Sequence, residues 1–138
     1  MPIVTDPLVL RCPPDDLDTV HDYVQQVLAA APDLDTMDKL KFETAIVELA
    51  ANAIQHSNGG TVAGSLTITV DGERIRGSMS DTSAASHVAL EPRDMPEELA
   101  ESGRGIAFIQ RLVDVLHYER RGEENVWTIE KLREKPQS

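Results

Sequence analysis

Three polar side chains at four-residue spacing form the pattern in this sequence that is best suited to chemistry: Glu48, Asn52 and His56. A step of four residues advances an α-helix by about 400°, so a helix through this segment carries all three on one face. An asparagine carbonyl oxygen is a ligand that Mg²⁺ accepts together with water and phosphate oxygens. A carboxylate one turn earlier could accept a proton from a hydroxyl nucleophile. The spacing alone is equally compatible with an alanine-rich solvent face.

Two further segments carry groups that suit a nucleotide. Asp81 follows an expected strand, where an ionised carboxylate could accept a hydrogen bond from the exocyclic amine of adenine, or could close its own turn. Gly103, Arg104 and Gly105 precede a segment of helical periodicity. The glycines would let backbone N–H groups approach phosphate and the arginine adds positive charge, although a flexible hinge explains them as well. The chain contains no G-x-x-x-x-G-K-S/T sequence, so this is not a P-loop.

Two amphipathic helices are predicted ahead of these segments. Apolar residues at helical spacing predict a first helix over about residues 15–31. A second helix should begin at residue 35 or 36 and run to about His56, where Asn58-Gly59-Gly60 can end it. This second helix carries the three polar side chains.

The remaining segments predict strands and one more helix. Period-two alternation and turn dipeptides indicate hairpins, and a new helical period opens at Gly105. The expected strands are 8–11, 65–70, 75–79, 115–121 and 125–132, and residues 81–105 form a long loop. Helices and antiparallel strands are thus segregated, which predicts one α+β domain over residues 1–138, built as a two-layer sandwich.

Composition narrows the functional classes. The 138-residue chain has a net charge of −11, which opposes direct binding to nucleic acid and suits a basic protein partner. No apolar run approaches the roughly 18 residues of a membrane span. The start of the chain lacks the features of an export signal, and its one cysteine, Cys12, cannot form an internal disulfide. We therefore expect a cytoplasmic protein with no membrane attachment.

Taken in order, these segments resemble a known family, the histidine-kinase-like ATPases, and within it the small anti-sigma-factor serine/threonine kinases of bacteria. Residues 48–56, ELAANAIQH, are similar to the N box of that family. Residues 102–114 are similar to its second glycine box with the following helix, and residues 125–131 to its closing strand. With the first helix included, the resemblance covers nearly the whole chain.

The resemblance implies a Bergerat-type fold, with helices on one face of a mixed, mostly antiparallel sheet, and it implies ATP and Mg²⁺ as cofactors. Asn52 would hold the metal, Glu48 would act as catalytic base, and Asp81 would recognise adenine with Thr128 nearby. The glycine segment would close over the phosphates. The ATP-binding residues implied in this way are Asn52, His56, Asp81, Gly103, Arg104, Gly105 and Thr128.

The same resemblance implies a homodimer that sequesters a sigma factor and phosphorylates an anti-sigma-factor antagonist, a partner-switching system of stress-response transcription regulation. One departure opens an alternative. The first glycine box of the family reads D-x-G-x-G, whereas this chain has Ser83 and Ala85 at the glycine positions. A side chain at such a position costs about 1 kcal/mol or more, or about tenfold in affinity. A binding module without catalysis is therefore an alternative to the kinase. A third interpretation, a fragment of a histidine kinase, would need a phosphoacceptor helix before Pro13.

Overall fold

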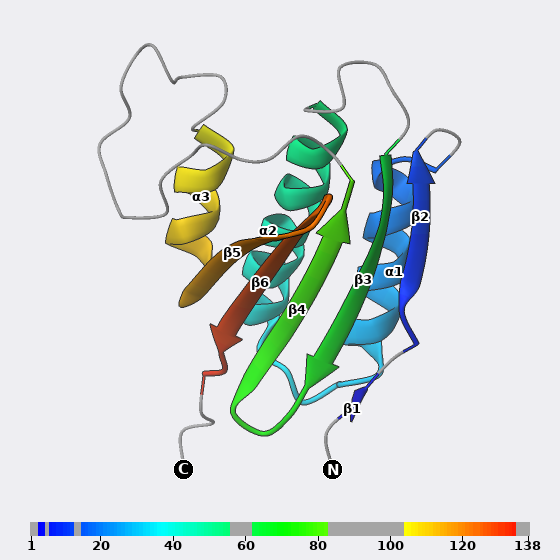
Figure 1. Ribbon diagram of the computed structural model, residues 1–138. Coiled ribbons are helices and arrows are strands. Elements are labelled where there is room, and N and C mark those ends of the chain that lie inside the picture. Colours follow the sequence, from blue (N-terminus) through cyan, green and yellow to red (C-terminus); the bar gives the residue numbers. More distant parts are fainter. Residues whose placement is uncertain (1–2, 5, 13–14, 56–61, 83–103, 135–138) are drawn as a thin grey trace.

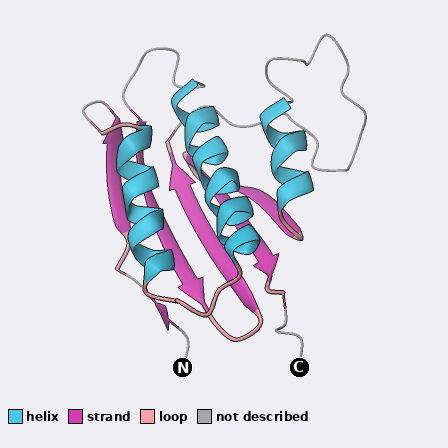
Figure 2. Cartoon of the chain, turned by 180° about the vertical axis from the view of Figure 1, so that it is seen from behind, coloured by secondary structure: helices cyan, strands magenta, loops and turns pink. Residues whose placement is uncertain are grey.

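The structure is a computed structural model that describes residues 3–4, 6–12, 15–55, 62–82 and 104–134 (Figure 1). Three helices lie on one face of a sheet, which Figure 2 shows from the helical side. The helices are α1 (Leu17–Ala29), α2 (Thr36–Gln55) and α3 (Arg104–Leu112). This arrangement confirms the predicted two-layer α+β sandwich.

The sheet has six strands, and every pairing among the described residues is antiparallel. The strands are β1 (Ile3–Val4), β2 (Leu8–Cys12), β3 (Val62–Val70), β4 (Arg74–Asp81), β5 (Val115–Arg121) and β6 (Glu124–Leu132). Their order is β1-β3-β4-β6-β5, with β2 also pairing with β3. The mostly antiparallel sheet expected from the sequence is confirmed, and the described part holds no parallel pair.

The predicted elements lie close to the observed ones. The first helix, expected over residues 15–31, spans Leu17–Ala29, and the second ends at Gln55. Position 56 and the expected terminator at 58–60 lie outside the described residues, as does most of the long loop. Strand β1 carries too few residues to show an alternation, and the sequence did not predict it. Among the described residues, none of the helices is both long and apolar enough to cross a membrane.

Helix α1 begins at a capping box and buries one apolar face. The Asp16 carboxylate accepts hydrogen bonds from the backbone N–H groups of Asp18 and Thr19, and the Thr19 hydroxyl accepts one from the Asp16 N–H. Val20 and Val24 on this helix are almost fully buried. α1 packs beside α2 and covers the side of the sheet that β2 and β3 form (Figure 2).

Helix α2 is seated on the centre of the sheet at Gly77 of β4. A Cβ atom at Gly77 would lie 2.8 Å from Ile46 Cδ1 and 3.0 Å from Phe42 Cζ, closer than side-chain carbons normally approach. Glycine therefore permits the helix to lie close to the strand. With Ile46, Phe42 and Leu49 buried against the sheet, the rotation of α2 about its own axis is fixed, and so are the positions of its polar side chains.

Candidate functional site

Four chain segments that are far apart in sequence end at the same edge of the sandwich. The last turns of α2, the end of β4, the start of α3 and the turn between β5 and β6 lie together at the top of Figure 1. α2 and α3 pack against each other there. The fold thus brings Asn52, Asp81 and the start of α3 to one end of the molecule, as the sequence interpretation required.

Glu48 and Asn52 occupy adjacent turns of α2 and are both half-buried. The Nδ2 atom of Asn52 is buried and, within the described part of the chain, has no hydrogen-bond partner. A buried amide group without a partner costs about 1–3 kcal/mol. The Asn52 nitrogen therefore keeps an unused capacity to donate, at the helix position where the sequence predicts a ligand-binding residue.

Asp81 closes β4 as a buried carboxylate, with 3% of its surface exposed. Its Oδ1 accepts a hydrogen bond of 3.0 Å from Nδ2 of Asn125, which is 2% exposed and lies directly opposite on β6. Buried polar groups are normally hydrogen-bonded in this way, because a lost partner is expensive in a low-dielectric interior. Asp81 is thus held in the helix-facing layer at the end of the sheet, where the adenine-recognition role predicts a carboxylate.

Thr128 does not lie beside Asp81, and the prediction that it does is wrong. The strand register pairs Thr128 with Ser78, whereas Asp81 pairs with Asn125. Successive residues of a strand also point to opposite faces, and the buried residues of β6 are Asn125, Trp127 and Ile129. Thr128 therefore lies on the sheet face opposite the helices, and Asn125 holds the place next to the carboxylate.

Sequence reasoning missed Asn125 and its two donors. The Asn125 Oδ1 atom accepts hydrogen bonds from the Tyr118 hydroxyl at 2.5 Å and from Nη1 of Arg120 at 3.1 Å. Tyr118 also packs on Trp127, with ring centroids 4.5 Å apart. The signal that could have revealed Asn125 is the alternation of β6, because a polar residue two positions before an inward Trp127 must itself face inward.

The phosphate-side residues are only partly described. Arg104 and Gly105 are the first two residues of α3, and the buried Ile106 and Ile109 anchor that helix. A helix start offers free N–H groups and positive potential to an anion, so this end of α3 suits phosphate. The predicted residues His56 and Gly103 lie outside the described residues.

The residues present fit a magnesium ion that enters with a nucleotide. Among the described residues, no group of three or more His, Cys, Asp or Glu side chains could hold a metal by itself. Mg²⁺ binds through one or two protein oxygens while phosphates and water supply the others. The side-chain oxygen of Asn52, a half-buried residue in the last turns of α2, is a ligand of the required type.

Comparison with family models assigns the chain to a known family. The sequence model of one protein family, the histidine kinase-like ATPase domain, matches residues 11–131. The chain therefore belongs to the histidine kinase-like ATPase family, which confirms the resemblance seen in the sequence at the level of that family.

Two solved structures are similar to this chain. The chain is similar to the crystal structure of the RsbU and RsbW domains of Rv1364c from Mycobacterium tuberculosis, with a TM-score of 0.60 and 19% identity over 95% of this chain. It spans 34% of the length of that protein. The nucleotide-free catalytic domain of the histidine kinase ThkA is also similar, with a TM-score of 0.46 and 15% identity, covering 94% of this chain and 98% of that one. None of the curated proteins matches the chain in sequence.

Proposed function

We propose that this chain binds ATP with Mg²⁺ and acts as an anti-sigma factor with serine/threonine kinase activity toward an antagonist protein. The observation that carries the proposal is the placement of a buried carboxylate, Asp81, and an amide with unused capacity, Asn52, at the same end of a family-typical fold. The similarity of the chain to the anti-sigma-factor serine kinases in three sequence segments supports the partner-switching role. So does the fold that it shares with a protein containing an RsbW domain.

Each residue has a defined task in this proposal. The Asp81 carboxylate accepts a hydrogen bond from the adenine amine, and the start of α3 faces the phosphates with its free N–H groups. Asn52 supplies an amide oxygen to Mg²⁺, which when bound neutralises charge on the phosphates. Glu48, one turn earlier on α2, accepts the proton of the attacking serine or threonine hydroxyl. Glu48 and Asn52 thus place base and metal ligand on one rigid helix.

Thermal unfolding with and without Mg-ATP tests the binding step. A ligand present at about 100 times its dissociation constant stabilises the folded state by about 2.7 kcal/mol, so the melting temperature should rise. GTP at the same concentration is the matched control, because it presents a carbonyl where adenine presents an amine. An unchanged melting temperature at millimolar Mg-ATP would contradict the proposal at its first step.

A second candidate is a partner-binding module without phosphotransfer, in agreement with the replacement of two expected glycines by Ser83 and Ala85. Phosphotransfer from Mg-ATP to an antagonist protein encoded in the same genome separates the two candidates. The kinase transfers phosphate to a serine or threonine of the antagonist. The module forms the same complexes, and the antagonist stays unphosphorylated.

A further inference from the structure

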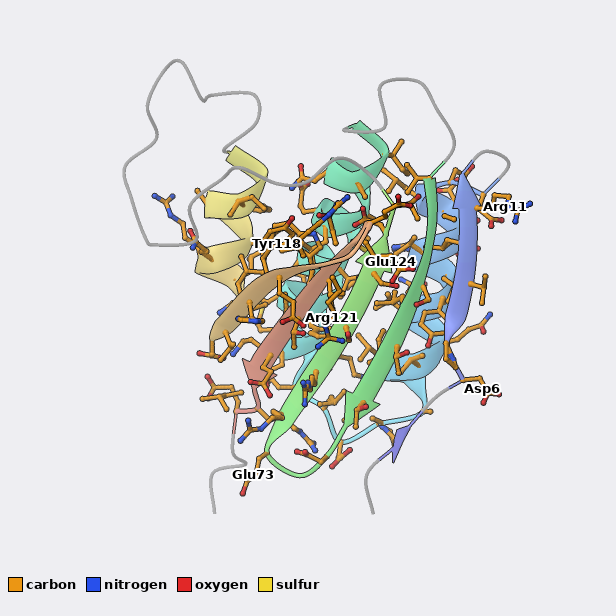
Figure 3. All side chains as sticks on the ribbon, in the orientation of Figure 1. Asp6, Arg11, Glu73, Tyr118, Arg121 and Glu124 are labelled. Atoms are coloured by element: carbon orange, nitrogen blue, oxygen red, sulfur yellow. The ribbon has the colours of Figure 1, made fainter. Side chains whose placement is uncertain are left out.

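Four polar side chains form a connected group at the end of the sheet where β4 ends. Asp81 and Asn125 are its buried members, and Tyr118 and Arg120 come from the neighbouring strand β5. Figure 3 labels Tyr118 near the end of the molecule at which β4 stops. The hydrogen bonds run across three strands, from β5 through Asn125 on β6 to Asp81 on β4.

The donors from β5 fix the orientation of the Asn125 amide. An asparagine side chain has one accepting oxygen and one donating nitrogen, which are easily exchanged by rotation. A guanidinium can only donate, so the Asn125 atom 3.1 Å from Arg120 Nη1 must be the oxygen. The Tyr118 hydroxyl donates to the same oxygen. The Asn125 nitrogen therefore faces Asp81, and Asp81 accepts its hydrogen bond as a carboxylate.

The buried polar pair Asp81–Asn125 occupies inward positions that apolar residues could fill. The next inward residues of β6 are Trp127 and Ile129, and the next inward residue of β4 is Met79, all of them buried. Burying a carboxylate and an amide carries a desolvation cost that a hydrophobic pair avoids, so such groups are weak contributors to stability. A buried polar pair that ends two strands at the nucleotide end of the fold points to a role in recognition.

We propose that Asn125 is a positioning residue: through Tyr118 and Arg120 it holds the Asp81 carboxylate as a fixed hydrogen-bond acceptor, and it thereby sets the preference of the site for a purine with an amine at C6. A purine with a carbonyl at C6 would place an acceptor against an acceptor and is rejected. The inference rests on the proposed nucleotide site. It concerns Asn125, Tyr118 and Arg120, to which the family resemblance assigns no role.

The test compares the dissociation constants of ATP and inosine triphosphate, both with Mg²⁺, measured by calorimetry on the full chain. The two nucleotides differ at C6 and at N1: ATP has the C6 amine and an unprotonated N1, whereas inosine triphosphate has the C6 carbonyl and an N1–H. The native chain should bind ATP about tenfold or more tightly than inosine triphosphate. In Asn125→Asp the amide donor to Asp81 is replaced by a second carboxyl group, and the two adjacent groups must share a proton. When Asp81 carries that proton it can donate to a C6 carbonyl, so the ATP preference should fall about tenfold, in part through tighter binding of inosine triphosphate.

A second variant leaves Asn125 in place. Tyr118→Phe with Arg120→Met removes both donors to the Asn125 oxygen, so the amide can rotate, and the ATP preference should again fall about tenfold. Because Arg120 is exposed, its replacement should leave the core packing intact and the variant should fold. Ser78→Ala on β4 is the matched control, because residue 78 faces the side of the sheet away from Asp81, and its ATP preference should be native.

The outcomes separate the inference from the function on which it rests. Folded Asn125→Asp or double-variant protein that keeps the native ratio of ATP to inosine triphosphate affinity would overturn the positioning role alone. A native chain that binds neither nucleotide would overturn the proposed nucleotide site and this inference with it. A loss of thermal stability with an unchanged ratio would assign the group a purely structural role, which also overturns the inference.

Discussion

The two ends of the sandwich handle polar groups in opposite ways. At the nucleotide end, Asn52 keeps an amide nitrogen without a partner among the described residues. At the other end, the buried Asp38 near the start of α2 accepts the Glu134 N–H at 2.7 Å and lies 3.5 Å from the Lys131 ammonium. Arg133 there donates to the Asp33 carboxylate and to the Asp71 backbone carbonyl. One end thus leaves capacity for a ligand, whereas the other uses its polar groups to hold the chain together.

This contrast teaches that polarity and burial alone do not mark a site. Asp38 and Asp81 are equally buried aspartates in the same protein, with 2% and 3% of their surfaces exposed. Asp38 is paired with a cation and a backbone donor, as a structural carboxylate is expected to be. Asp81 instead accepts a hydrogen bond from the neutral amide of Asn125, which is itself held by donors from β5.

The largest expected effect is that of Glu48→Gln, which tests the proposed chemistry at the end of the sandwich that holds Asn52. Removing the base should lower phosphotransfer from Mg-ATP to the antagonist by about 10²- to 10⁴-fold, because the attacking hydroxyl then loses its proton acceptor. Binding of Mg-ATP should stay native, since the glutamine fills the same space. Labelled phosphate on the antagonist is the measurement. Native transfer rates in the variant would remove Glu48 from the role of base.

At the opposite end, Asp38→Ala should lower the free energy of unfolding by about 3 kcal/mol. The change leaves the Glu134 N–H without its acceptor and takes one of two carboxylate neighbours from the Lys131 ammonium, with Asp114 remaining. Urea unfolding followed by circular dichroism measures the loss. The dissociation constant of Mg-ATP should be native in the folded variant, and a weaker ligand affinity would show that the two ends are coupled.

Asn52→Ala should move affinity and stability in opposite directions. Affinity for ATP in the presence of Mg²⁺ should fall about tenfold, and affinity in excess EDTA should change little, because the lost group is the proposed metal ligand. The unliganded variant should be as stable as the native chain or more stable by up to about 1 kcal/mol, since a buried amide nitrogen without a partner is removed. A marked loss of stability without ligand would mean that Asn52 has a structural partner.

The smallest expected effect concerns acid stability at the structural end. The Arg133 guanidinium holds the pKa of Asp33 below its ordinary value, and backbone hydrogen bonds from Glu73 and Arg74 do the same for the pKa of Asp71. A carboxylate whose pKa is lower in the folded state stabilises the fold above its unfolded pKa and loses that effect as the pH falls through the folded pKa.

Unfolding midpoints in urea between pH 5 and about pH 3 measure this dependence. The midpoint should fall with pH, and Asp33→Asn should make the fall shallower while lowering the midpoint at pH 5. Asp33 is exposed, so solvent screening keeps the change in this variant small. An equally steep fall in the variant would exclude the Asp33–Arg133 pair as a source.

Whether the sequence could predict a feature depends on how far apart along the chain the interacting residues lie. The α2 face with Glu48 and Asn52 is a local pattern of one helix, and the hairpins follow from alternation and turn residues such as Gly122, which has a φ of +59°. The Asp81–Asn125 pair joins residues 44 positions apart. It depends on β4 and β6 being neighbours in a sheet whose order is not the sequence order.

The error at Thr128 has the same physical origin. Resemblance placed this residue near Asp81 by its motif, but the side chain that reaches the carboxylate is decided by strand register and by the face to which each residue points. A shift of three positions along β6 changes both. The residues that share a helix face can be read from local periodicity, whereas the neighbours of a strand residue depend on strand order and register in the whole sheet.

The absence of a side chain at Gly77 has a consequence for how this domain can vary. Ile46 and Phe42 occupy the volume that a methyl group would need, so the spacing between the two layers depends on three positions jointly. An alanine at 77 would lift the segment of α2 that lies two residues before Glu48, unless a shorter residue replaced Ile46 at the same time. Substitutions at 77 and 46 should therefore be tolerated as a pair more readily than singly, because a mismatch between them would displace the part of α2 that precedes Glu48.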